Sequence, residues 1–240
     1  MTENNIISDR QAAYLKGDST TLQLSFLTHK IRQAWAEGKI AHGCFLDVSA
    51  AFDCVWHHGL LSKLKHAGIT GDLHDLLASY LSNRLAKTCV EGQYSETVNV
   101  KAGVPQGSRL GPLLFLVFIN DIVTDLESTP QIFADDTTLL TAASDTHETT
   151  SILNRDLTRI AAWAKKFKVT FNSDKTKEII FSKQVMNNSL PLIFDGHIAD
   201  RCGKHKHLGI TLSNKIDGMK HDSRSLFKVV YINQIHVPKP

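Results

Sequence analysis

Two adjacent aspartates, Asp135 and Asp136, separate two short apolar runs, and a third aspartate, Asp47, ends another apolar run earlier in the chain. Adjacent acids repel each other and resist burial unless a cation neutralises them, and hard cations such as Mg²⁺ prefer carboxylate oxygens. A fold that gathers these three carboxylates would suit phosphoryl or nucleotidyl transfer. An isolated Asp-Asp pair is more often a turn whose side chains bind the local backbone. The order of the surrounding elements therefore decides between the two interpretations.

The hydrophobic pattern predicts an α/β fold. Helices are expected over residues 20–37, 59–66, 72–81, 107–121 and 146–168, strands over 41–48, 131–134, 137–141 and 176–182, and a β-hairpin over 86–103 with its turn at Glu91-Gly92. The core order is strand, helix, strand, strand, helix, strand, which is the split-βαβ or ferredoxin-like topology. Its crossover makes the first two core strands parallel, so we expect Asp47 and the Asp135-Asp136 turn at the same end of the sheet.

Composition places the chain among globular proteins. It has 240 residues, of which 42% are hydrophobic, and its longest apolar run, Leu113 to Ile119, is far too short to cross a bilayer. We expect an intracellular protein without a membrane partner. The four cysteines are scattered and indicate neither a disulfide framework nor a four-thiolate zinc site.

Charge is unevenly distributed although the formal net charge is only +3. Residues 1–150 carry 11 Lys/Arg against 17 Asp/Glu, whereas residues 151–240 carry 16 against 7. An acidic half joined to a basic half fits a division between a metal site and a track for a phosphate backbone. A solvated surface with charges of chance sign is the simpler alternative.

Further motifs surround the aspartates. The turn at residues 103–108 leads into a predicted helix; its glycines permit close approach of a substrate, and Gln106 offers amide donors and acceptors. Phe52 follows Asp47 by five residues. With these segments in this order, the chain resembles the reverse transcriptases of non-LTR (LINE-type, jockey-like) retrotransposons over about residues 10–212. The resemblance rests on Phe45-Leu46-Asp47, Ala51-Phe52-Asp53, Gly103-Val104-Pro105-Gln106-Gly107-Ser108, Gly111-Pro112-Leu113-Leu114-Phe115 and Phe133-Ala134-Asp135-Asp136, with two later motifs at Asn172-Ser173-Asp174-Lys175-Thr176 and His207-Leu208-Gly209.

This resemblance implies a right-hand polymerase palm and an RNA-directed DNA polymerase activity. The implied partners are an RNA template, a DNA primer and deoxynucleoside triphosphates. The implied cofactor is a pair of Mg²⁺ ions, for which Mn²⁺ can substitute. Asp47 and Asp135 would bind the metals, Asp136 would support the site electrostatically, and Lys175 would lie near the triphosphate as an acid for the leaving group.

The resemblance also implies a nucleotide and template site. The aromatic ring of Phe52 would act as a steric gate against a ribose 2′-hydroxyl. Gln106, flanked by Pro105 and Gly107, would contact the template-primer or the incoming nucleotide. From the residues alone, a phenylalanine such as Phe52 is more often part of the core, and a Gly-Ser pair is often a loop and helix cap.

The expected domain layout is partial fingers at residues 1–40, a palm at 41–185 with an insertion at about 55–102, and a palm–thumb junction with a divergent tail at 186–240. We expect a fragment with a truncated thumb. Asp18 stands where the family commonly has a basic residue. The main alternative is therefore a catalytically inactive remnant that retains at most nucleic-acid binding. A ferredoxin-like RNA-binding module is a weaker alternative, because the strands lack the expected RNA-binding motif.

Two other features are expected to be ordinary surface. Cys202, His205 and His207 have the ligand types for zinc, but no fourth ligand is apparent, so surface histidines are expected. The basic clusters at residues 165–168 and 204–207 could follow nucleic-acid phosphates, but short clusters of this kind are usually solvated faces.

Overall fold

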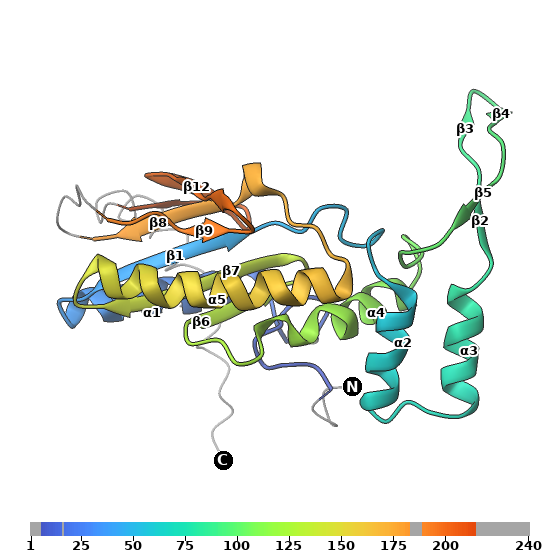
Figure 1. The fold of residues 1–240 in the computed structure, drawn as a ribbon, viewed down its shortest axis with the longest axis horizontal. Helices are drawn as coiled ribbons and strands as arrows, with labels where there is room; N and C mark the ends of the chain where they lie inside the picture. The colour runs from blue at the N-terminus through green and yellow to red at the C-terminus, as the bar shows by residue number, and fades with distance from the viewer. Residues whose placement is uncertain (1–5, 16, 183–188, 215–240) are drawn as a thin grey trace, which may run out of the picture. The chain divides into compact units, whose positions relative to one another are not determined.

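The computed structural model describes residues 6–15, 17–182 and 189–214. The chain divides into two compact units, which are treated separately because their relative placement is not determined (Figure 1). The sheet unit comprises Ala12–Asp47, Asp125–Ala161 and Asn172–Pro240, and the helical unit comprises Met1–Gln11, Val48–Thr124 and Ala162–Phe171.

The sheet unit contains the principal β-sheet. Its elements are α1 (Thr20–Ala36), β1 (Ile40–Leu46), β6 (Thr129–Phe133), β7 (Asp136–Ala143), the 3₁₀ turn η2 (Ser173–Lys175), β8 (Lys177–Phe181), β9 (Ile193–Phe194), β10 (His197–Ile198), β11 (Asp200–Arg201), β12 (Lys204–His207) and β13 (Ile210–Ser213). The long helix α5 (Thr146–Phe167) begins in this unit and ends in the helical unit. At the start of α1 the Ser19 side chain accepts a hydrogen bond from the Leu22 amide and so caps the helix.

The sheet has the predicted split-βαβ topology. Its strand order is β11-β8-β1-β7-β6, and β1 pairs antiparallel with both β7 and β8 while β6 pairs antiparallel with β7. β1 and β6 therefore run parallel, as the crossover requires, and their carboxyl ends lie at the same end of the sheet. β11 was not predicted; it adds a parallel edge strand beside β8.

Helices cover both faces of this sheet (Figure 1). On one face α1 contributes Leu27, Ile31, Ala34 and Trp35 to a buried cluster with Ala41 and Phe45 of β1 and residues of β7, β8 and β13. Side chains alternate along a strand, so His42 and Cys44 point to the opposite face, where His42 contacts Thr149 of α5. All seven residues of β1 are buried, His42 included, so the strand shows no alternation of buried and exposed side chains.

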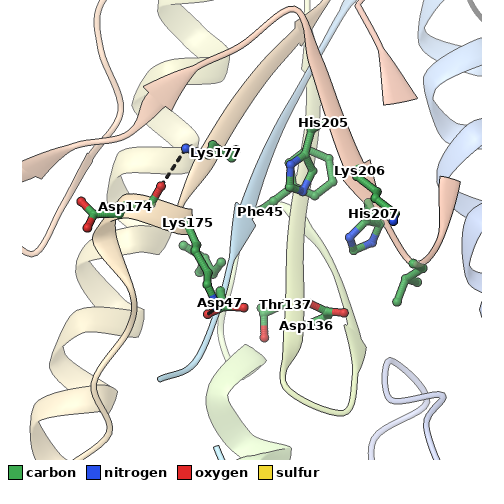
Figure 2. A pocket seen from close by; sticks show the side chains of 12 residues that line it. Phe45, Asp47, Asp136, Thr137, Asp174, Lys175, Lys177, His205, Lys206 and His207 are labelled. Atoms are coloured by element: carbon green, nitrogen blue, oxygen red, sulfur yellow. Dashed lines mark hydrogen bonds and ion pairs between the residues drawn. The ribbon is translucent and has the colours of Figure 1, made fainter. Parts of the chain in front are cut away.

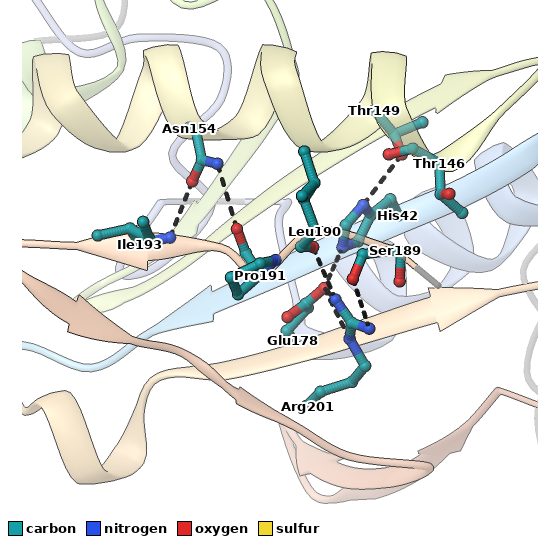
Figure 3. A network of polar contacts seen from close by, with 10 residues as sticks. All are labelled: His42, Thr146, Thr149, Asn154, Glu178, Ser189, Leu190, Pro191, Ile193 and Arg201. Carbon is teal, nitrogen blue, oxygen red and sulfur yellow. Dashed lines mark hydrogen bonds and ion pairs between the residues drawn. The ribbon is translucent and has the colours of Figure 1, made fainter. Parts of the chain in front are cut away.

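A buried polar network crosses β1, β8 and β11 (Figure 3). His42 and Glu178 are 0% and 1% exposed, and their Nε2 and Oε1 atoms are 2.9 Å apart. Arg201 donates to the same Oε1 from Nε at 3.0 Å and from Nη2 at 2.8 Å. Burial opposes ionisation of Glu178, yet the hydrogen bonds from His42 and Arg201 hold its pKa below the ordinary value. The network thus carries a buried carboxylate with two basic partners.

The helical unit is built around three amphipathic or apolar helices. Its elements are α2 (His57–His66), α3 (Asp72–Leu81), β2 (Arg84–Ala86), β3 (Cys89–Val90), β4 (Gln93–Tyr94), β5 (Val98–Val100), α4 (Leu110–Ile119) and the 3₁₀ turn η1 (Asn120–Val123). Predicted hairpin geometry is confirmed: β3 and β4 pair around Glu91 and Gly92, whose φ angles are 49° and 79°. The predicted helix at 107–121 begins at Leu110 and tightens into η1.

Candidate active site

Strand pairing brings two of the three aspartates to neighbouring positions. β1 ends at Leu46, which lies opposite Thr137 of β7, and Phe45 lies opposite Lys177 of β8. One further step in the same register sets Asp47 beside Asp136 (Figure 2). Asp136 is the first residue of β7 and pairs with Phe133 of β6. The predicted convergence of these segments is confirmed within the sheet unit.

The third aspartate, Asp135, lies in the two-residue turn between β6 and β7. Ala134, the other turn residue, has φ of 57°, a left-handed conformation that hairpin turns usually give to glycine. Asp135 therefore lies in the turn itself, and Asp136 directly after it is the first residue of β7. Both side chains are half-buried, so the turn holds two adjacent carboxylates partly away from solvent.

The electrostatics of these carboxylates are unfavourable when no cation is present. Burial, followed by the negative charges of Asp135 and Asp47, raises the pKa of Asp136 to about 6. Burial also raises the pKa of Asp135, with an additional contribution from Asp47. Lys175 opposes both effects without cancelling them. The three acids therefore interact across the strand ends, and their mutual repulsion is only partly compensated.

Lys175 reaches the site from η2. Its Nζ lies 3.2 Å from Asp47 Oδ2, and its side chain is 64% exposed (Figure 2). The Asn172 side chain accepts from the amides of Asp174 and Lys175 and thereby shapes the turn. The Asn172 amide donates to the Asp47 carbonyl at 2.9 Å, which fixes the turn to the end of β1. The ammonium group of Lys175 therefore contacts the carboxylate of Asp47, which is a candidate metal ligand.

A cavity of about 280 Å³ adjoins the aspartates. It is lined by residues of β1, β7, η2, β8 and β12, among them Asp47, Asp136, Thr137, Lys175, His205 and His207 (Figure 2). The rings of His205 and His207 lie 4.7 and 5.1 Å from the ring of Phe45. Burial, with a smaller contribution from nearby His205, lowers the pKa of His207 to about 4. His207 is therefore a neutral ring in this wall at neutral pH.

Sequence analysis missed the two histidines of this wall. They were expected at the surface, which is wrong for His207, whose exposure is 9%. The available signal was the alternation of lysine and histidine over residues 204–207 followed by Leu208 and Gly209, both of which have positive φ as a tight hairpin turn requires. In a strand with that alternation, the histidines share one face.

The remaining predicted site residues lie in the helical unit. Phe52 is half-buried, and its ring stacks on Phe115 with centroids 4.9 Å apart. The Val104 amide donates to the Phe52 carbonyl at 2.8 Å, and Gln106 Nε2 donates to Asp53 Oδ1 at 2.9 Å. The segments carrying Phe52 and Gln106 are therefore held side by side.

Backbone geometry explains the small residues of the 103–111 segment. A Cβ on Gly103 would lie 2.9 Å from the Asp53 Cα, and its φ is 86°, so only glycine fits. Gly107 also has a positive φ, of 81°. Pro105 contributes its carbonyl, which accepts from Ser108 Oγ at 2.8 Å, and Ser108 Oγ in turn accepts from the Gly111 amide at 2.9 Å. The capping role considered for Ser108 is thus present at the start of α4.

The acidic strand ends have suitable chemistry for a hard divalent cation. They supply carboxylate oxygens, carry negative charge that Lys175 compensates only in part, and open into a cavity. No three carboxylate, imidazole or thiol groups within residues 6–15, 17–182 and 189–214 already stand close enough to form a complete metal cluster. The residues fit a divalent cation by donor type and charge.

The split-βαβ sheet with acids at its strand ends defines a polymerase palm. The chain belongs to the reverse transcriptase family: its residues 1–212 match the family described as reverse transcriptase (RNA-dependent DNA polymerase). Members of this family generally use divalent metal ions. The predicted resemblance is confirmed.

Relatives from Drosophila melanogaster narrow the class to non-LTR retrotransposon enzymes. The chain is 35% identical to the probable RNA-directed DNA polymerase from transposon BS over 90% of its length, and 33% identical to the RNA-directed DNA polymerase from mobile element jockey over 84%. It spans 25% and 23% of those proteins. The fold is similar to that of apo telomerase from Candida tropicalis truncated from its C-terminal domain, with a TM-score of 0.59, 13% identity and coverage of 85% of this chain and 39% of that one.

The described residues include no helix that is long and apolar enough to span a membrane.

Proposed function

We propose that this chain catalyses RNA-templated DNA synthesis by nucleotidyl transfer, using two divalent cations. Mg²⁺ is the proposed metal, with Mn²⁺ as a substitute, and the proposed partners are an RNA template, a DNA primer and deoxynucleoside triphosphates. The observation that carries the proposal is the convergence of Asp47, Asp135 and Asp136 at adjoining strand ends, where their charge is only partly compensated. Family membership supports the same activity.

Each side chain has a distinct part in this proposal. Asp47 and Asp135 donate carboxylate oxygens to the metals, and Asp136 adds negative charge beside them. Bound metals lower the pKa of the primer 3′-hydroxyl and neutralise charge on the triphosphate and its leaving group. Lys175 is ion-paired with Asp47 in this structure. It is therefore close enough to the acids to face a triphosphate and donate a proton to the departing pyrophosphate.

Nucleotide and template contacts are assigned to the helical unit. We assign Phe52 to the steric gate against a ribose 2′-hydroxyl, and Gln106 with neighbouring Pro105 and Gly107 to the template or incoming nucleotide. Support comes from the hydrogen bond between the Val104 amide and the Phe52 carbonyl, which holds the two segments together. The stacking of Phe52 on Phe115 keeps its ring in a fixed orientation, as a gate requires.

The domain layout inferred from the sequence is carried forward as part of this proposal. Residues 1–40 would be partial fingers, 41–185 the palm with its insertion, and 186–240 a palm–thumb junction followed by a divergent tail, of which 215–240 lie outside the described residues. An intracellular location is likewise proposed.

The direct test is Mg²⁺-dependent primer extension on an RNA template at low salt. Asp135→Asn removes one candidate ligand and should abolish extension, while Asp174→Asn, an exposed acid lining the same cavity, should extend normally. Both proteins should fold equally well by circular dichroism. Normal extension by Asp135→Asn would refute the metal assignment, and a folded wild type without extension would favour the alternative of a remnant that at most binds nucleic acid.

A further inference from the structure

A second cavity, of about 800 Å³, lies within the helical unit and contains no candidate catalytic residue. It is formed by α2, the α4–η1 junction and the C-terminal end of α5. The residues that characterise it are Trp56, His58, Lys63, His66, Lys166 and Phe167. Its lining therefore combines aromatic rings with basic groups, which is a pairing that the proposed polymerase chemistry does not use.

We call this cavity the basic groove. Lys63 lies at its floor, and the charge of Lys63 is neutralised within the protein by Asp121. Lys63 donates to the Asp121 carboxylate and to the Phe118 carbonyl, and its ammonium lies 3.6 Å from the ring centroid of Phe167. Trp163 Nε1 also donates to Asp121, at 2.7 Å. Burial lowers the pKa of Lys63 to about 8, although Asp121 opposes the shift. Lys63 and Asp121 thus hold three helical segments together rather than meeting a ligand.

The rim of the groove carries two lysines, Lys166 and Lys168, which do not pair with Asp121 as Lys63 does. Lys168 Nζ lies 4.6 Å from the ring centroid of Trp56, and Lys166 Nζ lies 5.3 Å from that of Phe167. The His58 ring lies 5.4 Å from the Trp56 ring. Both lysines and His58 are exposed. Among the described residues that line the groove, Asp121 is the only acid, and it is already paired with Lys63.

Gly59 makes room for the aromatic wall. A Cβ at this position would lie 2.6 Å from a Trp56 ring carbon and 3.2 Å from a Phe167 ring carbon. Because Gly59 has no side chain, the Trp56 and Phe167 rings can both pack against α2 at this position. Gly59 is the only glycine between His57 and His66. Trp56 is only half-buried in this arrangement and keeps part of its surface at the groove.

We propose that this basic groove binds a single-stranded nucleic acid, with bases packing on Trp56 and His58 and phosphates contacting Lys166 and Lys168. Single strands are recognised by this combination of aromatic surfaces and cations, because unpaired bases expose their π-faces while the backbone supplies negative charge. A duplex would hide its bases, and a small anion would have no use for the aromatic wall. The proposal goes beyond polymerase activity and holds for a catalytically silent chain.

The test is binding of a fluorescein-labelled oligouridine of about 20 nucleotides, followed by anisotropy over a salt series in the Asp135→Asn background. Two phosphate contacts on a single strand should contribute about 1.4 to the log–log salt slope. Lys166→Ala/Lys168→Ala should therefore make the slope shallower by about this amount and weaken binding by about 25-fold at 0.1 M salt. Both lysines are exposed, so the variant should fold. Lys30→Ala/Lys39→Ala removes the same charge from a half-buried position on α1 and an exposed position beside it, and should change neither quantity.

Crosslinking locates the strand independently of affinity. Oligouridine carrying 5-iodouridine should crosslink to the peptide containing Trp56 or His58, and the crosslink should disappear in Lys166→Ala/Lys168→Ala. An unchanged slope in that variant, equal loss in the control variant, or crosslinks confined to the sheet unit would overturn the proposal. Displacement of the RNA by polyglutamate of equal charge would also overturn it, because it would show a plain anion surface without base contacts. These results do not depend on primer extension, which tests the proposed polymerase activity separately.

Discussion

Removing one carboxylate from the acidic strand ends should stabilise the metal-free protein. In Asp136→Asn the side chain keeps nearly the same shape but carries no charge, so repulsion from Asp135 and Asp47 disappears. A pKa of about 6 against an ordinary value of 3.8 corresponds to at most about 3 kcal/mol at neutral pH. Asp136 is only half-buried, and solvent screening reduces the expected gain to about 1–2 kcal/mol.

The sign and pH range of this effect follow from linkage. A carboxyl group whose pKa is raised by folding binds its proton more tightly in the folded protein, so its favourable contribution is complete below about 3.8 and is lost as the pH rises through about 6. The stability difference between Asp136→Asn and wild type should therefore be near zero at about pH 4 and fully developed at about pH 7.

Urea unfolding in the presence of EDTA, followed by circular dichroism at both pH values, measures this difference. Asp174→Asn lines the same cavity and serves as the matched control, with an expected change within about 0.5 kcal/mol. Adding Mg²⁺ should stabilise wild type more than Asp136→Asn, because the ion relieves the repulsion that the substitution has already removed. A destabilised Asp136→Asn protein, or a gain that is the same at both pH values, would refute the electrostatic argument.

Four further substitutions test other parts of the structure. Phe52→Val should raise incorporation of ribonucleotides relative to deoxyribonucleotides by about tenfold or more; an unchanged ratio in primer extension would remove Phe52 from the gate. Glu178→Ala should cost about 3–5 kcal/mol in urea unfolding because it leaves the buried His42 ring without its carboxylate partner, whereas Glu127→Ala, which loses only exposed ion pairs, should lower stability far less. Gly59→Ala should cost about 1–3 kcal/mol by forcing a tryptophan ring to move, and equal stability by urea unfolding would contradict that packing. Ala134→Gly should stabilise the turn by about 1 kcal/mol, since Ala134 has φ of 57°, and a clear loss of stability would show that the turn is not strained.

Local patterns predicted the elements of the fold because each had its own signal. The 3/4 spacing of Leu24, Leu27, Ile31 and Trp35 marked α1, and all four side chains are buried. The turn residues Glu91 and Gly92 marked the β3–β4 hairpin. The strand order could then be inferred from chain order and the handedness of crossovers. Such patterns are local, so they still predict β1 and β6 although a long insertion separates the two strands in the chain.

The two-residue strands β9 and β10 lacked such a signal. β9 and β10 have two residues each, too few for an alternating pattern, and they depend on contacts with α5. Asn154 of that helix donates to the Pro191 carbonyl at 3.3 Å and accepts from the Ile193 amide at 2.8 Å (Figure 3). The position of His207 against Phe45 likewise depends on tertiary packing. Sequence patterns could not predict these contacts, because the partners are distant in the chain.

The buried polar network and the acidic strand ends depend on the same strand register. A slip of one residue along β1 would turn His42 away from Thr149 and Glu178 and leave its buried ring without these two partners. It would also move Asp47 away from Asp136, because both pairings follow from the position of β1 between β7 and β8. An apolar strand centre could tolerate such a slip more easily than a strand that carries a buried histidine. His42 and Glu178 therefore help to specify the register, and Glu178→Ala should impair primer extension even under conditions in which the variant remains folded.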